Sequence, residues 1–273
     1  MTTPTAIGVT APPGAPARTT RATVVDRTVD PTPVERVHRT LPIGTVLVLL
    51  TLVGGVVPIL TAWHFGALGI PRNDDWAYAL AAFHFADSAK VNGNSWSGMN
   101  LVGQLVLSVP VVKLFGHRIA ALQIEVAALG VLGLFATFDL AKQLLSPRRA
   151  LFVAVLVASL PMWTSLSASY MTDIPAFALA TACLALGARG IARDAVRAGY
   201  LSGSLAVGFL AFTVRENAIV APLAVSAATV WVAARRPRAR LFPIVAAIVT
   251  LLASAGLFYA WRRSLPGLSL IHI

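Results

Sequence analysis

The sequence predicts an all-α polytopic membrane protein with about seven transmembrane helices. Hydrophobic residues make up 57% of the chain and charged residues only 12%, with a mean hydropathy of +0.75. This is far more apolar than a soluble domain. The apolar residues gather in long runs, and Lys and Arg gather in the short segments between them. The net charge of +11 therefore reports membrane topology, and we expect membrane lipids and no nucleic acid as partners.

The N-terminal segment and the membrane domain differ in composition. Residues 1–40 are rich in Thr, Pro, Ala and Arg and cannot bury a core, so we expect a disordered cytoplasmic tail. The transmembrane domain, residues 41–273, begins with the apolar run Ile43 to Ala62, which is about the 20 residues that a helix needs to cross a bilayer. The run starts too far from Met1 for a secretory signal peptide, so it is expected to be a retained anchor.

Six further apolar runs complete the predicted spans, and a shorter one decides their direction. The further spans are Ile119 to Ala141, Ala150 to Ser167, Ile174 to Gly187, Tyr200 to Val214, Ala218 to Ala234 and Leu241 to Trp261. Leu101 to Phe115 is short and interrupted by polar residues and Pro110, so we interpret it as an interfacial or re-entrant helix. On that interpretation 15 of the 22 Lys and Arg residues lie on the cytoplasmic side, together with the N-terminus. The opposite choice would reverse this bias beyond the tail.

The rare acidic residues are predicted to converge on the outer side of the plasma membrane. The chain has only 11 acidic residues, and two of them, Asp74 and Asp75, are adjacent in a long first outer loop, residues 63–118. The same topology puts Asp173 and the pair Arg215-Glu216 in outer loops. Within the first loop, Trp76, Leu80 and Phe83 recur at helical spacing, which predicts a second surface helix beside Leu101 to Phe115. Two such helices would shape an outer vestibule.

Each of these residues also has a purely structural explanation. Asn73 or Asp74 would suit the cap of the helix that follows. Thr172 or Asp173 would cap a span that begins near Pro175, whose missing N–H suits a first turn. Arg215 and Glu216 would form an ordinary pair that anchors a turn at the interface. The sequence leaves both explanations open at every one of these positions.

Glu125, Asp139 and the histidines are further polar candidates. Glu125 lies about two turns inside a span, which is costly unless it faces protein or water, so it would close a polar network with Gln123 or Arg118 or face the vestibule. Asp139 precedes Lys142 by three residues, a spacing that pairs them on one helix face and requires no function. The histidines show no metal-ligand spacing, although His84 follows the acids on the predicted surface helix.

The arrangement of these residues resembles a family, the polyprenyl-phosphate-dependent glycosyltransferases with the GT-C membrane fold, which include protein O-mannosyltransferases and aminoarabinose transferases. That family shows an Asp, an adjacent acid and a Tyr four residues after the Asp in its first outer loop, matched here by Asp74, Asp75 and Tyr78. It shows a Phe-Gly that closes a surface helix, matched by Phe115-Gly116. An Asp near a Pro at the start of the second outer loop is matched by Asp173 and Pro175.

Three departures from the family pattern bear on the assignments. The second acid is Asp75 where Glu is commoner, Gly98-Met-Asn-Leu101 stands where a Lys-Pro pair often opens the surface helix, and Gln123 replaces an Arg that follows the Phe-Gly. The chain also ends at Ile273, soon after its last span, whereas the resemblance implies further spans and an outer domain. We therefore expect a C-terminally truncated GT-C-like chain or a fragment of one.

The resemblance implies a lipid donor, a sugar joined to polyprenyl phosphate, and a protein, lipid or glycan acceptor. Glycosyl transfer develops positive charge at the anomeric carbon, so carboxylates nearby stabilise the transition state and one removes the acceptor proton. We assign Asp74 as general base and Asp173 as the second acid. Arg215 is the first choice for the leaving phosphate, ahead of Arg72 and Lys90. The supporting or substrate-binding residues are Asp75, Tyr78, Arg215, Glu216 and Arg72.

A cofactor and two other functions stay open from the sequence. A divalent cation bridging Asp74 and Asp173 would fit the carboxylates, but the chain has no dedicated metal motif. A transporter would use Asp74, Glu125 and Asp173 along a polar route, although the spans offer little toward the cytoplasmic side except Asp139 and no inverted repeat. An inactive membrane scaffold with the same fold is the third alternative.

Overall fold

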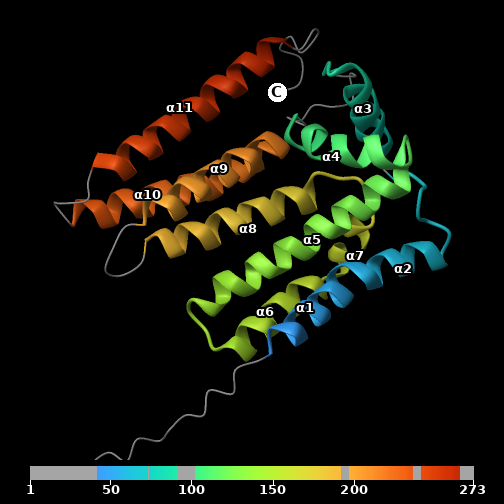
Figure 1. The fold of residues 1–273 in the computed structure, drawn as a ribbon, viewed down its shortest axis with the longest axis horizontal. Helices are drawn as coiled ribbons and strands as arrows, with labels where there is room; N and C mark the ends of the chain where they lie inside the picture. The colour runs from blue at the N-terminus through green and yellow to red at the C-terminus, as the bar shows by residue number, and fades with distance from the viewer. Residues whose placement is uncertain (1–41, 73, 92–101, 192–196, 236–240, 265–273) are drawn as a thin grey trace, which may run out of the picture. The chain divides into compact units, whose positions relative to one another are not determined.

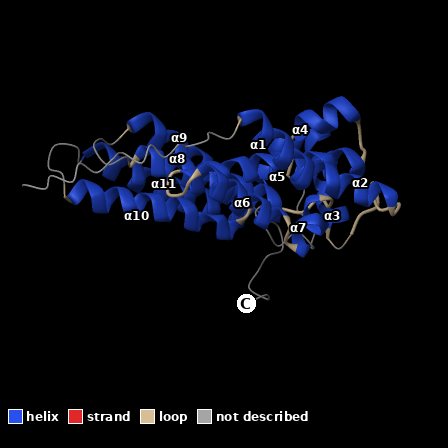
Figure 2. Ribbon diagram, turned by 90° about the horizontal axis from the view of Figure 1, so that it is seen from below, coloured by secondary structure: helices blue, strands red, loops and turns tan. Residues whose placement is uncertain are grey.

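The described part of the chain is helical throughout. The computed structural model describes residues 42–72, 74–91, 102–191, 197–235 and 241–264, and the predicted tail, residues 1–40, lies outside them. The elements are α1 (Ile43–Thr51), η1 (Leu52–Val56), α2 (Val57–His64), α3 (Asp75–Ser88), α4 (Val102–Phe115), α5 (Ile119–Lys142), α6 (Pro147–Ala158), α7 (Pro161–Ser167), α8 (Asp173–Gly190), α9 (Ala198–Val214), η2 (Glu216–Ile219), α10 (Val220–Ala234) and α11 (Leu241–Ser264). Figure 1 shows their arrangement and Figure 2 their helical character.

Every apolar run predicted as a span is helical, and the chain is a membrane protein. Three helical stretches in the described residues are long and apolar enough to cross a bilayer, namely Ile43–His64, Ile119–Lys142 and Glu216–Ala234. The pair α6 and α7, which bends by 68° at a short break, forms either a fourth, broken span or a re-entrant loop. The bend falls at Leu160, which precedes Pro161 and has extended backbone angles because a proline disfavours the helical conformation of the residue before it. The count of seven spans stays a prediction.

The first span contains one wide turn that fits it against α5 and α7. Residues Leu52–Val56 form a π-helix between α1 and α2, with Gly54 and Gly55 buried. A Cβ atom at Gly55 would lie 2.8 Å from the side chain of Val131, so the missing side chain lets α5 approach. The carbonyl of Gly54 accepts a hydrogen bond of 3.0 Å from the indole Nε1 of Trp163 in α7. Gly54, Gly55 and the indole of Trp163 therefore bring the first span, α5 and α7 into contact at the π-helix.

The central helices pack closely through small residues, as membrane helices commonly do. A Cβ atom at Gly133 of α5 would lie 2.9 Å from both Cα and Cβ of Ala178 in α8. Near the other end of the same two helices Asp139 pairs with Arg189 of α8, while Lys142 lies over the Phe138 ring. The expected pairing of Asp139 with Lys142 is not the contact observed. The ion pair instead fixes α5 to α8.

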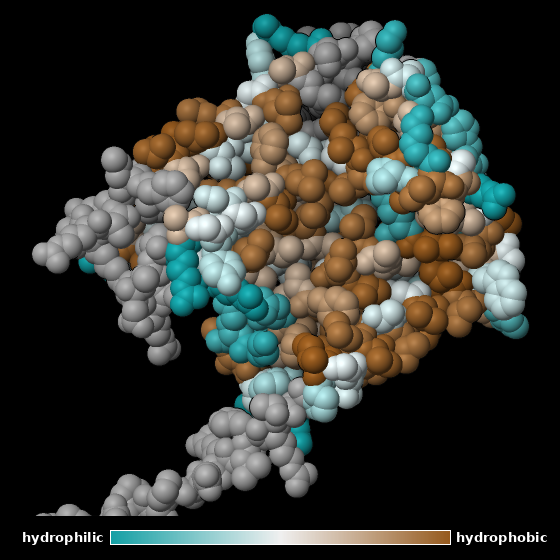
Figure 3. All heavy atoms as spheres, viewed as in Figure 1, coloured by the Kyte–Doolittle hydropathy of each residue, from teal (hydrophilic) through white to brown (hydrophobic). Residues whose placement is uncertain are grey.

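The surface of the described helices separates into an apolar band and polar ends. In Figure 3 brown, hydrophobic residues cover the middle of the helices and teal, polar residues gather toward their ends. Trp63 and Phe65 at the end of α2 are highly exposed, and so is Trp231 near the end of α10, where the guanidinium of Arg235 lies 4.4 Å from its ring centre. Exposed aromatic residues at the ends of apolar helices are typical of the membrane interface.

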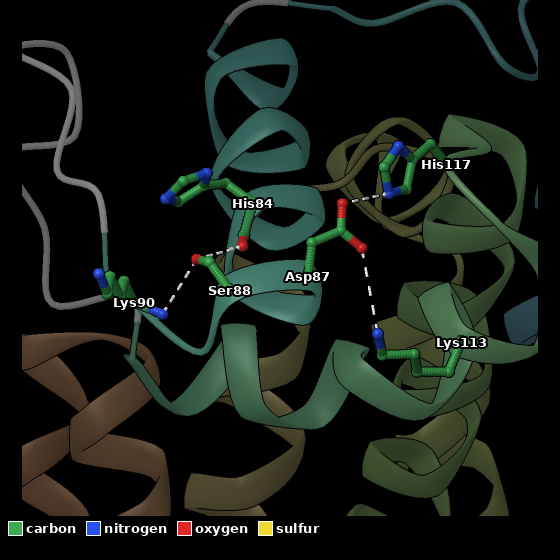
Figure 4. Close-up of polar contacts among 6 residues, drawn as sticks. All are labelled: His84, Asp87, Ser88, Lys90, Lys113 and His117. Carbon is green, nitrogen blue, oxygen red and sulfur yellow. Dashed lines mark hydrogen bonds and ion pairs between the residues drawn. The ribbon is translucent and has the colours of Figure 1, made fainter.

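The two predicted surface helices of the first outer loop are present and contact each other. The 14 residues of α4 are too few to cross a bilayer as a helix, at about 1.5 Å per residue. The carboxylate of Asp87 in α3 lies 3.1 Å from Nε2 of His117 and 4.0 Å from Nζ of Lys113 in α4, and Figure 4 shows both contacts. The rings of Phe83 and His117 stack with centres 4.7 Å apart. These contacts hold the C-terminal end of α3 to the C-terminal end of α4.

Only part of the predicted apolar stripe of α3 is exposed, because Phe83 packs against the core. Trp76 and Leu80 are exposed, whereas the buried face of α3 carries mostly small residues, together with Asp75 and Tyr78. Large apolar side chains on the outer face suit a helix that lies against lipid, and small ones on the inner face allow close packing. The register of α3 therefore turns one acid of the pair inward, toward the start of α8.

Candidate active site

The two adjacent acids have opposite environments. Asp74 is exposed and occupies the residue before α3, where its carbonyl accepts the backbone N–H groups of Ala77 and Tyr78 at 3.0 and 3.2 Å. Its side chain makes no capping hydrogen bond. The capping explanation therefore accounts for the position of Asp74 but not for its carboxylate, which remains accessible beside the start of the helix.

Asp75 is fully buried and fixes the chain around it. Its Oδ1 atom accepts the backbone N–H of Arg72, and its carboxyl also accepts the backbone N–H of Trp76 and, from the turn before α8, that of Tyr170. Burial raises the pKa of Asp75, while these hydrogen bonds and the nearby Arg72 charge lower it. Asp75 thus contacts both the segment before α3 and the turn before α8, and its supporting role stays a prediction.

Asp173 and Arg215 form a pair between two outer loops. Asp173 is the first residue of α8, and its Oδ1 lies 2.5 Å from Nη1 of Arg215, which directly follows α9. The same Nη1 donates to Oγ1 of the buried Thr172 at 3.2 Å. Arg215 therefore binds Asp173 across the bundle, and Glu216, half-buried, begins the turn η2. Thr172 occupies the cap position of α8 without a side-chain capping bond.

Tyr78 shows that the predicted residues converge. Its side chain is only 2% exposed, and burial raises the pKa of its phenol. The charges of Asp74 and Asp173 raise this pKa further, and the charge of Arg215 lowers it. Charged groups from three separate segments of the sequence therefore act on one phenol. Among them, Asp173 and Arg215 are in direct contact.

A cleft of about 240 Å³ extends from this group along α8. Asp173, Arg215 and Asn217 form its polar end, and Ala176, Phe177 and Ala180 continue it down the helix. Seven residues separate Asp173 from Ala180, which corresponds to about 10 Å along the helix axis. The cleft is polar at the N-terminal end of α8 and apolar further along this helix, so it suits a molecule with a charged head and an apolar tail.

A second cleft, of about 300 Å³, lies on the side of Arg72. It runs between α2 and α7, and its polar lining consists of Arg72, Thr61, Thr164 and Ser165. Of these, Arg72 is two residues from Asp74 in sequence. Hydroxyl groups and one guanidinium make this cleft suitable for a hydroxylated or anionic ligand. The first cleft is therefore bordered by Asp173, and the second by Arg72.

Glu125 and Gln123 do not bond to each other, as the sequence suggested, but to two different segments. Glu125 does not bond to Gln123 or Arg118, because its Oε1 atom accepts a 3.0 Å hydrogen bond from Ser108 of α4. Gln123 instead holds the first outer loop, with its Oε1 atom 2.7 Å from the N–H of Gly69 and its Nε2 atom 3.2 Å from the carbonyl of Ile70. Both side chains extend from α5 to different outer segments.

Two buried polar residues, Tyr170 and Ser108, were not predicted from the sequence, and a third, Thr172, was considered only as a helix cap. Tyr170, Thr172 and Ser108 are fully buried next to predicted site residues. The sequence nevertheless contains signs of this buried polar group. Tyr170 and Thr172 lie in the polar segment Ser169-Tyr-Met-Thr-Asp173, and Ser108 follows Gln104 by one helical turn in an otherwise apolar stretch. Polar residues spaced by one turn in an apolar helix indicate a buried hydrogen-bonded face.

Two other candidates lie apart from the group. Figure 4 shows the His84 ring pointing away from Asp87, and only its carbonyl is used, accepting from Ser88 at 2.8 Å. The backbone N–H of Lys90 donates to the Ser88 hydroxyl at 3.2 Å, and Lys90 is exposed. Within the described residues no group of three or more His, Cys, Asp or Glu side chains is placed to hold a metal ion.

Comparison with known proteins assigns the family. The sequence model of the dolichyl-phosphate-mannose-protein mannosyltransferase family matches residues 102–265, a region that contains Asp173 and Arg215 and begins after the acidic pair. Searches of curated proteins and of solved structures give no match. The match covers more than half of the chain and agrees with its apolar helices. This integral membrane protein therefore belongs to the dolichyl-phosphate-mannose-protein mannosyltransferase family of membrane glycosyltransferases.

Proposed function

We propose that the chain transfers a sugar from a polyprenyl-phosphate donor to a hydroxyl group of a protein, lipid or glycan acceptor at the outer face of the plasma membrane, with the N-terminus in the cytoplasm. The observation that carries the proposal is the ion pair of Asp173 and Arg215 at the polar end of a cleft that continues down α8, with the charge of Asp74 acting on the same buried Tyr78 phenol. Three scarce charges from segments far apart in the sequence meet at the end of an apolar bundle. That end carries few positive charges, as expected for an outer face.

The donor is assigned to the cleft along α8. Its phosphate would bind the guanidinium of Arg215, whose Nη1 is engaged by Asp173 and Thr172 while its other donors remain for an anion. The first units of the polyprenyl chain would follow Ala176, Phe177 and Ala180 toward the membrane. The acceptor is assigned to the cleft beside Arg72, where hydroxyl-bearing side chains suit a polar ligand.

The reaction then has a defined proton and charge balance. Asp74, which is exposed, takes the proton of the acceptor hydroxyl as the hydroxyl oxygen bonds to the anomeric carbon. The bond from that carbon to the phosphate oxygen breaks, and the polyprenyl phosphate leaves as an anion beside Arg215. Asp173 and Asp74 stabilise the positive charge that develops on the sugar. Asp75, Tyr78 and Glu216 support this group, and no step requires a divalent cation.

The test is sugar transfer in membrane vesicles from radiolabelled polyprenyl-phosphate donors that carry mannose or aminoarabinose. Asp74→Asn should abolish transfer and leave expression and membrane insertion normal. Asp87→Asn is the matched control, because Asp87 is an acid of the same helix that pairs with His117 and lies outside the group. Full activity of Asp74→Asn would refute the base assignment.

A second pair of variants tests the phosphate contact. Arg215→Ala should raise the donor concentration needed for half-maximal transfer, and Arg215→Lys should restore part of the affinity because it keeps the charge but not the paired donors. An unchanged donor dependence would exclude Arg215 as the phosphate ligand. Solute flux through vesicles without transfer would favour a transporter, and the absence of both activities an inactive scaffold.

A further inference from the structure

A buried chain of hydroxyl groups connects α5 to the turn before α8. The side chain of Tyr170 is 0% exposed, and its hydroxyl lies 2.7 Å from Oγ of Ser108 in α4. Ser108 in turn donates to Oε1 of Glu125 in α5 at 3.0 Å. A serine hydroxyl has one hydrogen, and here it is directed at Glu125, so Tyr170 must be the donor to Ser108. The chain of bonds runs from Tyr170 through Ser108 to Glu125.

Tyr170 is also bonded at its backbone to the other outer segment. Its N–H donates to the carboxyl of Asp75, the residue that directly follows Asp74. Tyr170 itself precedes Asp173 by three residues. One residue therefore contacts the first outer loop through its backbone and the core of the bundle through its phenol. Both acids assigned to the reaction lie within three residues of these contacts.

The setting of this hydroxyl chain makes it a defined structural link. Gln104 of α4 lies beside the Tyr170 hydroxyl and is 1% exposed. Ser108 and Tyr170 are fully enclosed, so water does not compete for their bonds. An alternative position of the turn would leave the Tyr170 hydroxyl without its acceptor in an apolar environment, which is unfavourable. The contacts thus favour a single placement of residues 170–173 relative to α3.

We propose that Tyr170 is a positioning residue that sets the separation of Asp74 and Asp173, and that Glu125, through Ser108, is its anchor. The inference rests on the proposed transferase function for its kinetic consequence, but the link itself is a property of the structure. Tyr170 touches neither cleft, so it acts through the two acids. Loss of its hydroxyl removes none of the substrate-binding side chains, but it makes the distance between Asp74 and Asp173 less well defined.

The kinetic test compares three variants with a matched control. Tyr170→Phe should lower kcat about tenfold, because a misplacement of about 1 Å costs up to about 10²-fold in rate. The donor KM should change less than twofold. Tyr200→Phe, at a partly exposed tyrosine of α9, should leave both values unchanged. Glu125→Gln keeps an acceptor oxygen for Ser108 and should retain at least about half of the activity of the native chain, whereas Glu125→Leu should match Tyr170→Phe.

A readout that needs no activity separates this inference from the proposed function. Hydrogen exchange measured on the detergent-solubilised chain should become at least about tenfold faster for the amides of residues 168–173 in Tyr170→Phe than in Tyr200→Phe. If the native chain transfers no sugar, the proposed function fails, and the exchange result still decides whether the link exists. Unchanged exchange, or an unchanged kcat per folded molecule in Tyr170→Phe, would overturn the inference.

Discussion

Replacement of Gly103 by alanine is the sharpest test of how α4 is placed against the candidate site. A Cβ atom at Gly103 would lie 2.9 Å from the backbone carbonyl carbon of Thr213 and 2.9 Å from Cγ2 of Val214, in the last turn of α9 before Arg215. Ordinary van der Waals contact begins at 3.4 Å. Oγ1 of Thr213 lies nearer still, and its hydroxyl is already bonded to the Leu210 carbonyl at 2.7 Å, so neither the side chain nor the backbone of Thr213 moves aside freely. The two helices must therefore separate by about 0.5 Å.

The expected cost of Gly103→Ala follows from two opposing effects. Overpacking of this kind costs about 1–3 kcal/mol, and the better helix propensity of alanine returns up to about 1 kcal/mol. With about 2 kcal/mol for the first effect and about 1 kcal/mol for the second, the net loss of about 1 kcal/mol should lower the unfolding temperature by roughly 2–4 °C. A shift of about 0.5 Å beside Arg215 should also lower the transfer rate roughly tenfold, on the scale at which about 1 Å costs about 10²-fold.

The assay for Gly103→Ala is thermal unfolding in detergent, followed by tryptophan fluorescence, together with sugar transfer in vesicles. Gly203→Ala on α9 is the control, because the nearest atom to a Cβ there, in Leu186, lies 4.0 Å away. The control should be as stable and as active as the native chain. Equal stability and equal transfer rates for the two variants would show that α4 does not approach α9 as described, and the placement of the site against α4 would be wrong.

Three further predictions test the helix contacts and one titration. Trp163→Phe leaves the Gly54 carbonyl without its hydrogen bond inside the bundle and should cost about 1–3 kcal/mol of unfolding free energy, which thermal unfolding in detergent will measure. Asp139→Asn and Arg189→Gln should each destabilise the protein, and a double-mutant cycle should show that their effects are coupled and do not add. Burial raises the pKa of Asp75 in the folded state, so the folded protein binds this proton more tightly than the unfolded chain does. The free energy of unfolding should therefore fall as pH rises from the usual carboxyl range through the raised pKa. When unfolding is followed across this range, the free energy of unfolding of Asp75→Asn should depend less steeply on pH than that of the native chain.

Each of these predictions can fail in a recognisable way. Trp163→Phe with native stability would mean that the π-helix carbonyl does not depend on the indole. Additive losses in the cycle would mean that Asp139 and Arg189 do not interact in solution. A pH slope that is unchanged by Asp75→Asn would place the titrating carboxyl elsewhere in the outer segments.

The identity and approximate bounds of the helices were readable from the sequence. The run Ile119 to Ala141 became α5, Ile119–Lys142, and the short run Leu101 to Phe115 became α4, Val102–Phe115. The physical reason is that a backbone in lipid must satisfy its own hydrogen bonds, so an apolar run of sufficient length has few choices besides a helix. The same local rules predicted that Asp74, Asp75 and Tyr78 stand at the start of a surface helix.

What the sequence determined by itself is therefore the set of helices, their membrane character and the outer-loop residues worth testing. Only the tertiary structure decided that Asp75 is buried while Asp74 is exposed, that Arg215 pairs with Asp173, and that Tyr170 bonds to Asp75. The difference has a physical reason. A helix forms from neighbours in sequence, but the partner of a side chain depends on the rotation of its helix and on the distance between helices, which close contacts of small residues such as Gly103 and Gly133 set.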